Sequence, residues 1–78
     1  MPSVVLFTSP GCTLCDRARA VLDGEGVVYD EVDITGDDEL EARYREWLPV
    51  VEIDGRRAFV YHVHPEGLRR KLRLLPRG

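Results

Sequence analysis

The sequence lacks long hydrophobic segments. Its apolar runs, such as Val4-Val5-Leu6-Phe7, are far shorter than the ~20 residues that a membrane-spanning helix needs. No basic segment precedes the first apolar run, as it would in a secretory signal peptide. Internal repeats and low-complexity segments are also missing. These absences predict a single domain over residues 1–78, located in the cytoplasm and making no use of a membrane.

Cysteine is scarce, with two residues among 78, Cys12 and Cys15. A disulfide-stapled scaffold would need more cysteines, spread along the chain to join distant segments. In a reducing compartment a closely spaced pair is more often catalytic or metal-binding. The pair is therefore the first candidate for a functional site.

Positive charge is in the minority, because 14 acidic residues outweigh 11 basic ones for a net charge of −3. The last third of the chain is nevertheless basic. Its helical part has the pattern of the solvated face of an amphipathic helix, so we expect no nucleic-acid partner. The basic residues of this part are Arg56, Arg57, Arg69, Arg70, Lys71, Arg73 and Arg77.

The cysteines lie at a predicted junction between a strand and a helix. Residues 3–8 form the near-continuous apolar run of a central strand, and Pro10-Gly11 interrupt it. Residues 12–23 are predicted to be helical, and Gly24 suits the left-handed position after a helix. The apolar residues at helical spacing are Cys15, Ala18 and Leu22.

This position favours redox chemistry. Residues three apart share a helix face, so Cys12 and Cys15 can form a short-loop disulfide. The free N–H groups and positive dipole end of a helix N-terminus favour a thiolate on Cys12, with Cys15 one turn inside as the resolving thiol. Arg17 and Arg19 would add to this stabilisation, whereas Asp16 would oppose it.

The middle of the chain predicts a second strand and a second helix. Residues 27–34 form a β-rich run that would lie parallel to the first strand in a βαβ unit. An Asp of the turn 35–38 is expected to cap the helix over residues 39–47. The residues expected in the core are Val28, Val32 and Ile34 on the strand and Leu40, Tyr44 and Trp47 on the helix.

The remaining part predicts a hairpin and a last helix. Asp54-Gly55 between two β-rich runs is a strong hairpin signal, so residues 56–63 should pair antiparallel with residues 50–53. Pro65 suits the first position of a helix. Its buried stripe would be Leu68, Leu72 and Leu75, and Pro76 would end it. The predicted fold is α/β, a four-stranded mixed sheet flanked by three helices, with the dithiol at the carboxyl end of the first strand.

Three functions are compatible with these residues. The first is a thiol–disulfide oxidoreductase using Cys12 and Cys15. The second is a metal-binding module in which His62 and His64, expected on one strand face and far along the chain from the cysteines, complete a zinc site. The third is a protein-binding adaptor in which the thiols are idle.

Three features stand out together: the predicted order of the elements, the Cys12-Thr13-Leu14-Cys15 motif after the first strand, and Leu48-Pro49 before the hairpin. In these features the sequence resembles a glutaredoxin-like member of the thioredoxin superfamily over nearly the whole chain. The resemblance implies that Cys12 attacks and Cys15 resolves. It implies that Pro49 is a cis-proline and that the backbone of Leu48 pairs with the disulfide substrate as a strand would. It also implies a monomer without bound cofactor, reduced by glutathione or a thioredoxin-type system.

The chain departs from the usual glutaredoxin pattern at positions that hold glutathione. Thr13-Leu14 replace a Pro-aromatic pair, and Thr8-Ser9 stand where a basic residue precedes the first cysteine. Residues 63–66 replace a Gly-Gly turn followed by acidic or hydroxyl residues. Two interpretations are open for Glu66 in the first turn of the last helix: it receives an ammonium group, or it is an N-terminal acid that the helix dipole alone explains, and we prefer the second.

Overall fold

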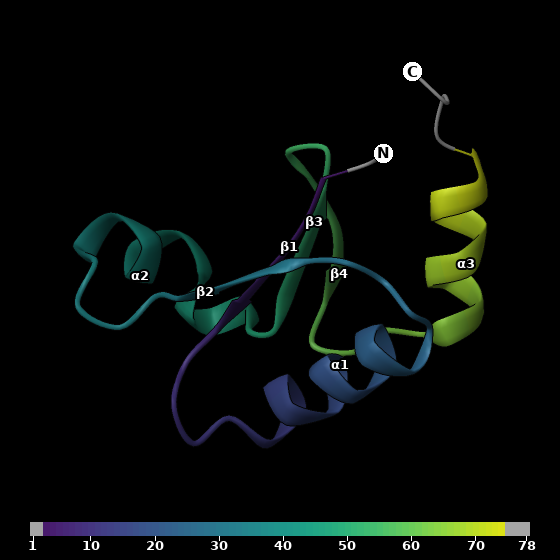
Figure 1. Ribbon diagram of the computed structural model, residues 1–78. Helices are drawn as coiled ribbons and strands as arrows, with labels where there is room; N and C mark the ends of the chain where they lie inside the picture. Colours follow the sequence, from purple (N-terminus) through teal and green to yellow (C-terminus); the bar gives the residue numbers. More distant parts are fainter. Residues whose placement is uncertain (1–2, 75–78) are drawn as a thin grey trace.

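A computed structural model describes residues 3–74 of the chain. The elements follow in the order β1 (Val4–Thr8), α1 (Thr13–Gly24), β2 (Asp30–Asp33), α2 (Asp38–Tyr44), a 3₁₀ helix (Arg45–Trp47), β3 (Val50–Ile53), β4 (Arg56–Val60) and α3 (Pro65–Leu74). The strands form one sheet in the order β2-β1-β3-β4, with β2 parallel to β1 and the other neighbours antiparallel. This is the mixed sheet with three α-helices that the sequence predicted (Figure 1).

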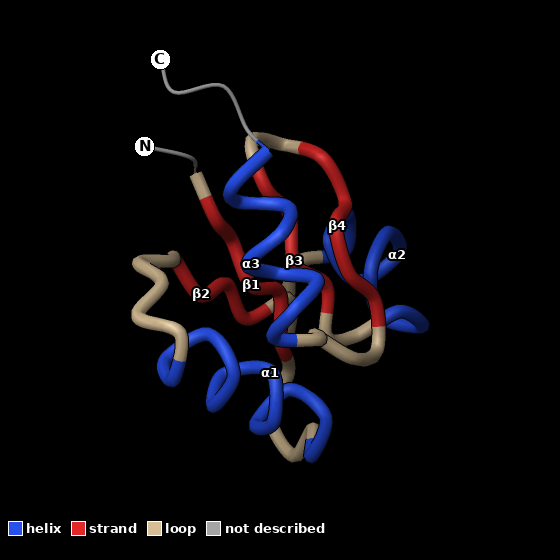
Figure 2. Tube along the Cα trace, turned by 90° about the vertical axis from the view of Figure 1, so that its right-hand side faces the viewer, coloured by secondary structure: helices blue, strands red, loops and turns tan. Residues whose placement is uncertain are grey.

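Each face of the sheet has its own apolar core, because side chains of a strand alternate between faces. On β1, Val4 and Leu6 pack with buried residues of α1 and α3, whereas Phe7 packs with Tyr44 of α2. The rings of Phe7 and Tyr44 stack with their centroids 4.2 Å apart. Helices α1 and α3 therefore cover one face and α2 the other, as Figures 1 and 2 show from two sides. This two-sided cover explains why β1 is almost continuously apolar.

The predicted cap of the second helix and the predicted hairpin turn are confirmed. Asp37 caps α2 by accepting a hydrogen bond from the Leu40 N–H at 3.0 Å. Asp54 and Gly55 form the hairpin turn with φ values of 52° and 80°, the left-handed conformations that a type I′ turn requires. The Asp54 side chain also accepts from the Ser3 N–H at 2.8 Å. The start of β1 is thereby attached to the hairpin.

The second strand was predicted too long. Val27 donates its N–H to the Leu22 carbonyl at the end of α1, so β2 begins only at Asp30. Val28 is 84% exposed rather than in the core, although Val32 and Ile34 do pack on the α2 face. The left-handed residue after α1 is Gly26 (φ 69°) and not Gly24, which still belongs to the helix.

Two further boundaries also differ. The predicted helix over residues 39–47 divides into α2 and the 3₁₀ turn, and Trp47 is 41% exposed instead of buried. Strand β4 ends at Val60, three residues early, because Tyr61 takes a positive φ of 65°. In α3, Leu68 is buried and Leu72 partly so, whereas Leu75 and Pro76 lie outside the described residues. Among residues 3–74, no helix has the length and apolar character needed to cross a membrane.

Candidate active site

The dithiol and the Leu48-Pro49 turn lie at the same end of the sheet. Strand β1 ends at Thr8, and Cys12 follows as the N-cap of α1. In the antiparallel register Phe7 pairs with Val50, the first residue of β3. Leu48-Pro49, which directly precede β3, therefore emerge beside the chain that leads from β1 to the cysteines. Residues distant in the sequence meet here because β1 and β3 are neighbours.

Cys12 and Cys15 are joined as a disulfide, with their Cα atoms 5.1 Å apart. The Cys15 backbone N–H donates to the Cys12 Sγ, the sulfur being 3.1 Å from the nitrogen. Cys12 is half-buried, whereas Cys15 is completely buried. When the pair is reduced, the N–H donor and the helix N-terminus favour negative charge on the Cys12 sulfur. Cys12 is also the sulfur that a second molecule can reach.

The Leu48-Pro49 turn is held by the segment after β4. The peptide bond between the two residues is cis, and Leu48 has the extended conformation (φ −63°, ψ 143°). The Tyr61 N–H donates to the Pro49 carbonyl at 3.0 Å and, more weakly, to the Trp47 carbonyl at 3.4 Å. The Pro49 side chain is fully buried. The turn thus presents an extended backbone at a fixed position.

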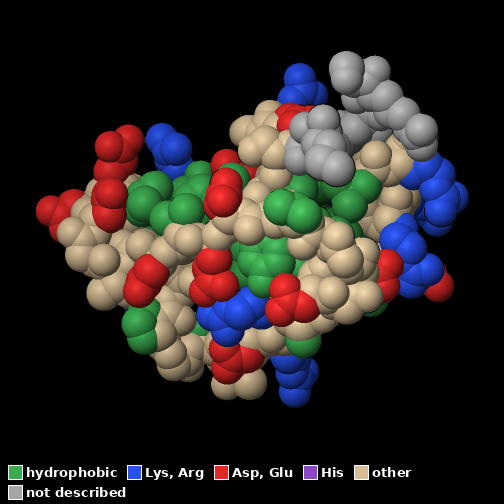
Figure 3. Space-filling view, in the orientation of Figure 1, with side chains coloured by type: hydrophobic (Ala, Val, Ile, Leu, Met, Phe, Trp, Pro, Cys, Tyr) green, Lys and Arg blue, Asp and Glu red, His purple; other side chains and the backbone are tan. Residues whose placement is uncertain are grey.

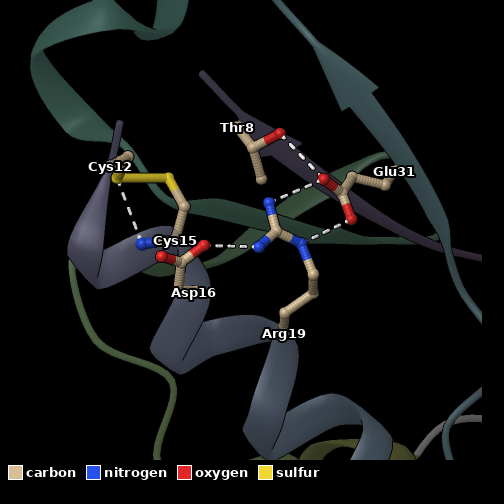
Figure 4. Close-up of a disulfide and its surroundings, with 6 residues drawn as sticks. All are labelled: Thr8, Cys12, Cys15, Asp16, Arg19 and Glu31. Carbon is tan, nitrogen blue, oxygen red and sulfur yellow. Dashed lines mark hydrogen bonds and ion pairs between the residues drawn. A yellow bond between two sulfur atoms is a disulfide. The ribbon is translucent and has the colours of Figure 1, made fainter. Parts of the chain in front are cut away.

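A closed polar network, made of Thr8, Asp16, Arg19 and Glu31, lies on one side of the dithiol (Figure 4). The Arg19 guanidinium donates to both carboxylate oxygens of Glu31 at 2.8 Å and to Asp16 at 2.6 Å. The buried Thr8 hydroxyl donates to Glu31 at 3.2 Å. The hydrogen bonds from Arg19 lower the pKa of Glu31, and the same bonds raise the pKa of Arg19. The Arg19 charge is thus paired within the chain by two carboxylates.

The histidines are not on a strand, contrary to the sequence prediction. His62 and His64 lie in the exposed loop before α3, with ring centroids 6.5 Å apart. The fold brings both to the pocket that Leu14, the residue before Cys15, also lines. Among residues 3–74, no three His, Cys, Asp or Glu side chains are grouped so that they could hold a metal ion.

Sequence reasoning missed part of this site. It named Asp16 and Arg19 as neighbours of the cysteines but not Glu31 and Thr8, which complete the network. A polar Thr8 that ends an apolar strand was the available signal, together with an acidic residue on the parallel strand beside it. The contact between α1 and the loop before α3 had no local signal, because it joins residues far apart in the chain.

Comparisons with known proteins agree with this geometry. The model of the family described as glutaredoxin-like domain matches residues 3–73. A gene 56 protein of Mycobacterium phage D29 is 36% identical over 56 residues, which span 65% of this chain and 62% of the phage protein.

Solved structures share the fold. The protein XcR50 from X. campestris superposes with a TM-score of 0.84 at 27% identity, covering 95% of this chain and all of the other. Buckwheat glutaredoxin, solved with glutathione, gives a TM-score of 0.65 at 21% identity, over 92% of this chain and 69% of that one, and so supports the fold alone. Because the family model matches residues 3–73, this chain belongs to the glutaredoxin-like domain family of the thioredoxin superfamily.

Proposed function

We propose that the protein is a thiol–disulfide oxidoreductase that reduces disulfides of proteins or small molecules through Cys12 and Cys15. The observation that carries this proposal is the asymmetry of the pair. Cys12 is accessible at a helix N-terminus and accepts a backbone N–H, whereas Cys15 is completely buried behind it. An attacking sulfur needs access and stabilised charge, and a resolving sulfur needs proximity to the attacking one.

The reaction proceeds in two exchanges. The Cys12 thiolate attacks one sulfur of the substrate disulfide, which breaks the substrate S–S bond and releases one substrate thiolate that takes up a proton. Cys15, deprotonated, then attacks Cys12 Sγ in the mixed disulfide and releases the second substrate thiol. Two electrons pass to the substrate, and the Cys12–Cys15 disulfide remains, as in the structure. An external thiol must then reduce it.

Leu48 supplies the proposed docking edge. Its extended backbone lies outside the β3 pairing, so it can bond to an extended substrate chain as an added strand would. Pro49 has no N–H and, with its side chain buried, sets the position of Leu48 beside the dithiol.

The reductant is glutathione or a thioredoxin-type system. Membership of the glutaredoxin-like family makes glutathione one candidate co-substrate, and buckwheat glutaredoxin, which has the same fold, was solved with it. Thr8-Ser9 and Thr13-Leu14 replace residues that hold glutathione in ordinary glutaredoxins, and these differences favour a thioredoxin-type system as the reductant. Both reductants operate in a reducing compartment, and we therefore propose the cytoplasm as the site of action.

The test is reduction of a small mixed disulfide by glutathione, coupled to NADPH consumption by glutathione reductase, and in parallel by thioredoxin with thioredoxin reductase. We expect NADPH-dependent turnover with one of the two systems. Cys12→Ser should reduce turnover to the background rate because the attacking sulfur is gone. Cys15→Ser should accumulate a mixed disulfide on Cys12, detected by intact-mass measurement, and retain part of the glutathione-dependent rate.

Equal, small effects of the two substitutions would contradict the assigned roles. Absence of turnover with both systems, from protein whose two thiols are titrated as free, would favour the adaptor function. In that case a partner would bind the Cys12→Ser/Cys15→Ser variant as tightly as the unchanged protein.

A further inference from the structure

A pocket of about 220 Å³ opens beside the dithiol, between α1 and the loop before α3. We call it the dithiol pocket. Its apolar lining includes Leu14 and Val21 from α1 and the buried Val63 from the loop. Leu14 lies between Cys12 and Cys15 in the sequence, so the pocket begins within one helical turn of the reactive pair, although neither cysteine lines it.

The polar lining of the dithiol pocket is basic. Arg17, His62 and His64 are all exposed, and none of the described lining residues is acidic. Within residues 3–74 Arg17 forms no ion pair, whereas Arg19 on the same helix is bonded to two carboxylates. The chain as a whole has a net charge of −3. In Figure 3, acidic side chains are spread over the face that the view presents, while basic ones stand at the right-hand edge near α3 and at separate places elsewhere. A basic rim at this place therefore runs against the overall charge.

Exposed aromatic side chains extend this surface toward the Leu48-Pro49 turn. Tyr61 lines the dithiol pocket, and its ring centroid is 6.0 Å from that of Trp47, each residue being 41% exposed. Tyr61 has a φ of 65°, a conformation in which bulky residues are rare. Such strained positions persist mostly at functional sites. Aromatic residues and Arg are also the residues enriched in the central parts of protein interfaces.

The pocket volume favours a polypeptide ligand. Sites for whole small molecules occupy about 300–1,000 Å³, more than this pocket offers. An apolar floor of this size accommodates one or two side chains. The basic rim would attract a carboxylate, which Arg17 can bind through two parallel N–H donors.

From these observations we propose that the dithiol pocket is a specificity site for polypeptide substrates whose target cysteine is flanked by an apolar and an acidic residue. The apolar side chain enters between Leu14 and Val63, and the carboxylate faces Arg17 and the two histidines. The substrate backbone then continues along Leu48. This inference rests on the proposed oxidoreductase function and names its substrate class.

The experiment compares three disulfide peptides that differ in one residue beside a Leu-Cys unit: Glu, Gln or Lys. Each is reduced by pre-reduced protein in a single turnover, and the second-order rate constant is measured at low ionic strength. We expect the Glu peptide to react about tenfold faster than the Lys peptide, with the Gln peptide between them, because a complementary rim raises the encounter rate. Added salt should reduce the ratio.

Arg17→Gln should bring the Glu/Lys rate ratio close to one. The matched control is Arg56→Gln, which removes the same charge at the hairpin end of β4 and should leave the ratio unchanged. An unchanged ratio in Arg17→Gln, or no preference in the unchanged protein, would overturn the proposal.

Two other outcomes are distinguishable. Failure of the unchanged protein to reduce any disulfide refutes the oxidoreductase function itself, whereas reduction of all peptides at one rate refutes the specificity site alone. If Arg17→Gln slows glutathione-dependent turnover as much as it slows the Glu peptide, the pocket serves glutathione, and the polypeptide assignment is wrong.

Discussion

Helix α1 carries charged residues on both sides of the dithiol, and the two sides differ in what those residues contact. On the side of the closed polar network, Arg19 is bonded to Asp16 and Glu31, and the buried Thr8 completes the set. On the side of the dithiol pocket, Arg17 has no ion pair within residues 3–74 and stands at an exposed rim. Two arginines of one helix, separated in the sequence by Ala18 alone, thus occupy opposite environments.

The difference indicates which side acts on a partner. A charge that is already neutralised within the fold contributes to stability and offers little to a ligand. A charge without an internal partner loses little when it binds a carboxylate from another molecule. Substitutions in the network should therefore change the free energy of unfolding, and substitutions around the pocket should change substrate rates.

The largest difference is expected between two leucines of α1. Leu22 is completely buried in the core between α1 and the sheet, so Leu22→Ala should lower the free energy of unfolding by about 2–5 kcal/mol through lost burial and a cavity. Leu14 is half-buried at the pocket, and Leu14→Ala should cost roughly 1 kcal/mol or less. Urea unfolding of the two oxidised variants measures both values. Similar losses would mean that the pocket is part of the core and not an open surface.

Local signals in the sequence were enough to predict most of the fold. The alternation of apolar residues, the Asp54-Gly55 turn and the cysteines before an amphipathic helix act over a few residues, so they are visible without the structure. The same reasoning failed at Val28, where an apolar residue in a β-rich run is left unpaired because the chain before Asp30 follows α1 instead of the sheet. A pattern of residue types does not show where pairing begins.

The candidate site was predictable only in its reactive centre. The spacing of Cys12 and Cys15 is a local property, and Leu48-Pro49 followed from the family resemblance. Which side of α1 would meet Glu31 and which would meet the loop before α3 depends on contacts between distant segments. Arg17 and Arg19 look equivalent in the sequence, and the packing of α1 makes them different.

A matched pair of arginine substitutions tests the comparison directly. Arg19→Gln removes the partner of two carboxylates and should cost about 1 kcal/mol of unfolding free energy, whereas Arg17→Gln should leave it nearly unchanged. Unfolding in urea at low salt provides both values. At 1 M NaCl the gap should narrow, because the screening length falls to about 3 Å. A larger loss from Arg17→Gln than from Arg19→Gln would reverse the assignment of the two sides.

The smallest effect is a pH dependence from Glu31. Its pKa in the folded protein is lowered mainly by the hydrogen bonds from Arg19, so the folded state favours the ionised form more than the unfolded state does. The resulting stabilisation is present above the carboxyl pKa of the unfolded chain, about 4.3, and is lost as the pH falls through the lower pKa of the folded protein. Since the side chain is 36% exposed, we expect Glu31→Gln to cost only about 0.5 kcal/mol of unfolding free energy at pH 7.

Thermal or urea unfolding from pH 7 to pH 3 measures this dependence. The unfolding free energies of the Glu31→Gln variant and the unchanged protein should converge at the acidic end. Glu46→Gln is the control, because Glu46 is exposed and has no ion pair within residues 3–74. The difference in unfolding free energy between this variant and the unchanged protein should stay constant over the same pH range. A gap between Glu31→Gln and the unchanged protein that stays constant down to pH 3 would mean that the network does not depend on the charge of Glu31.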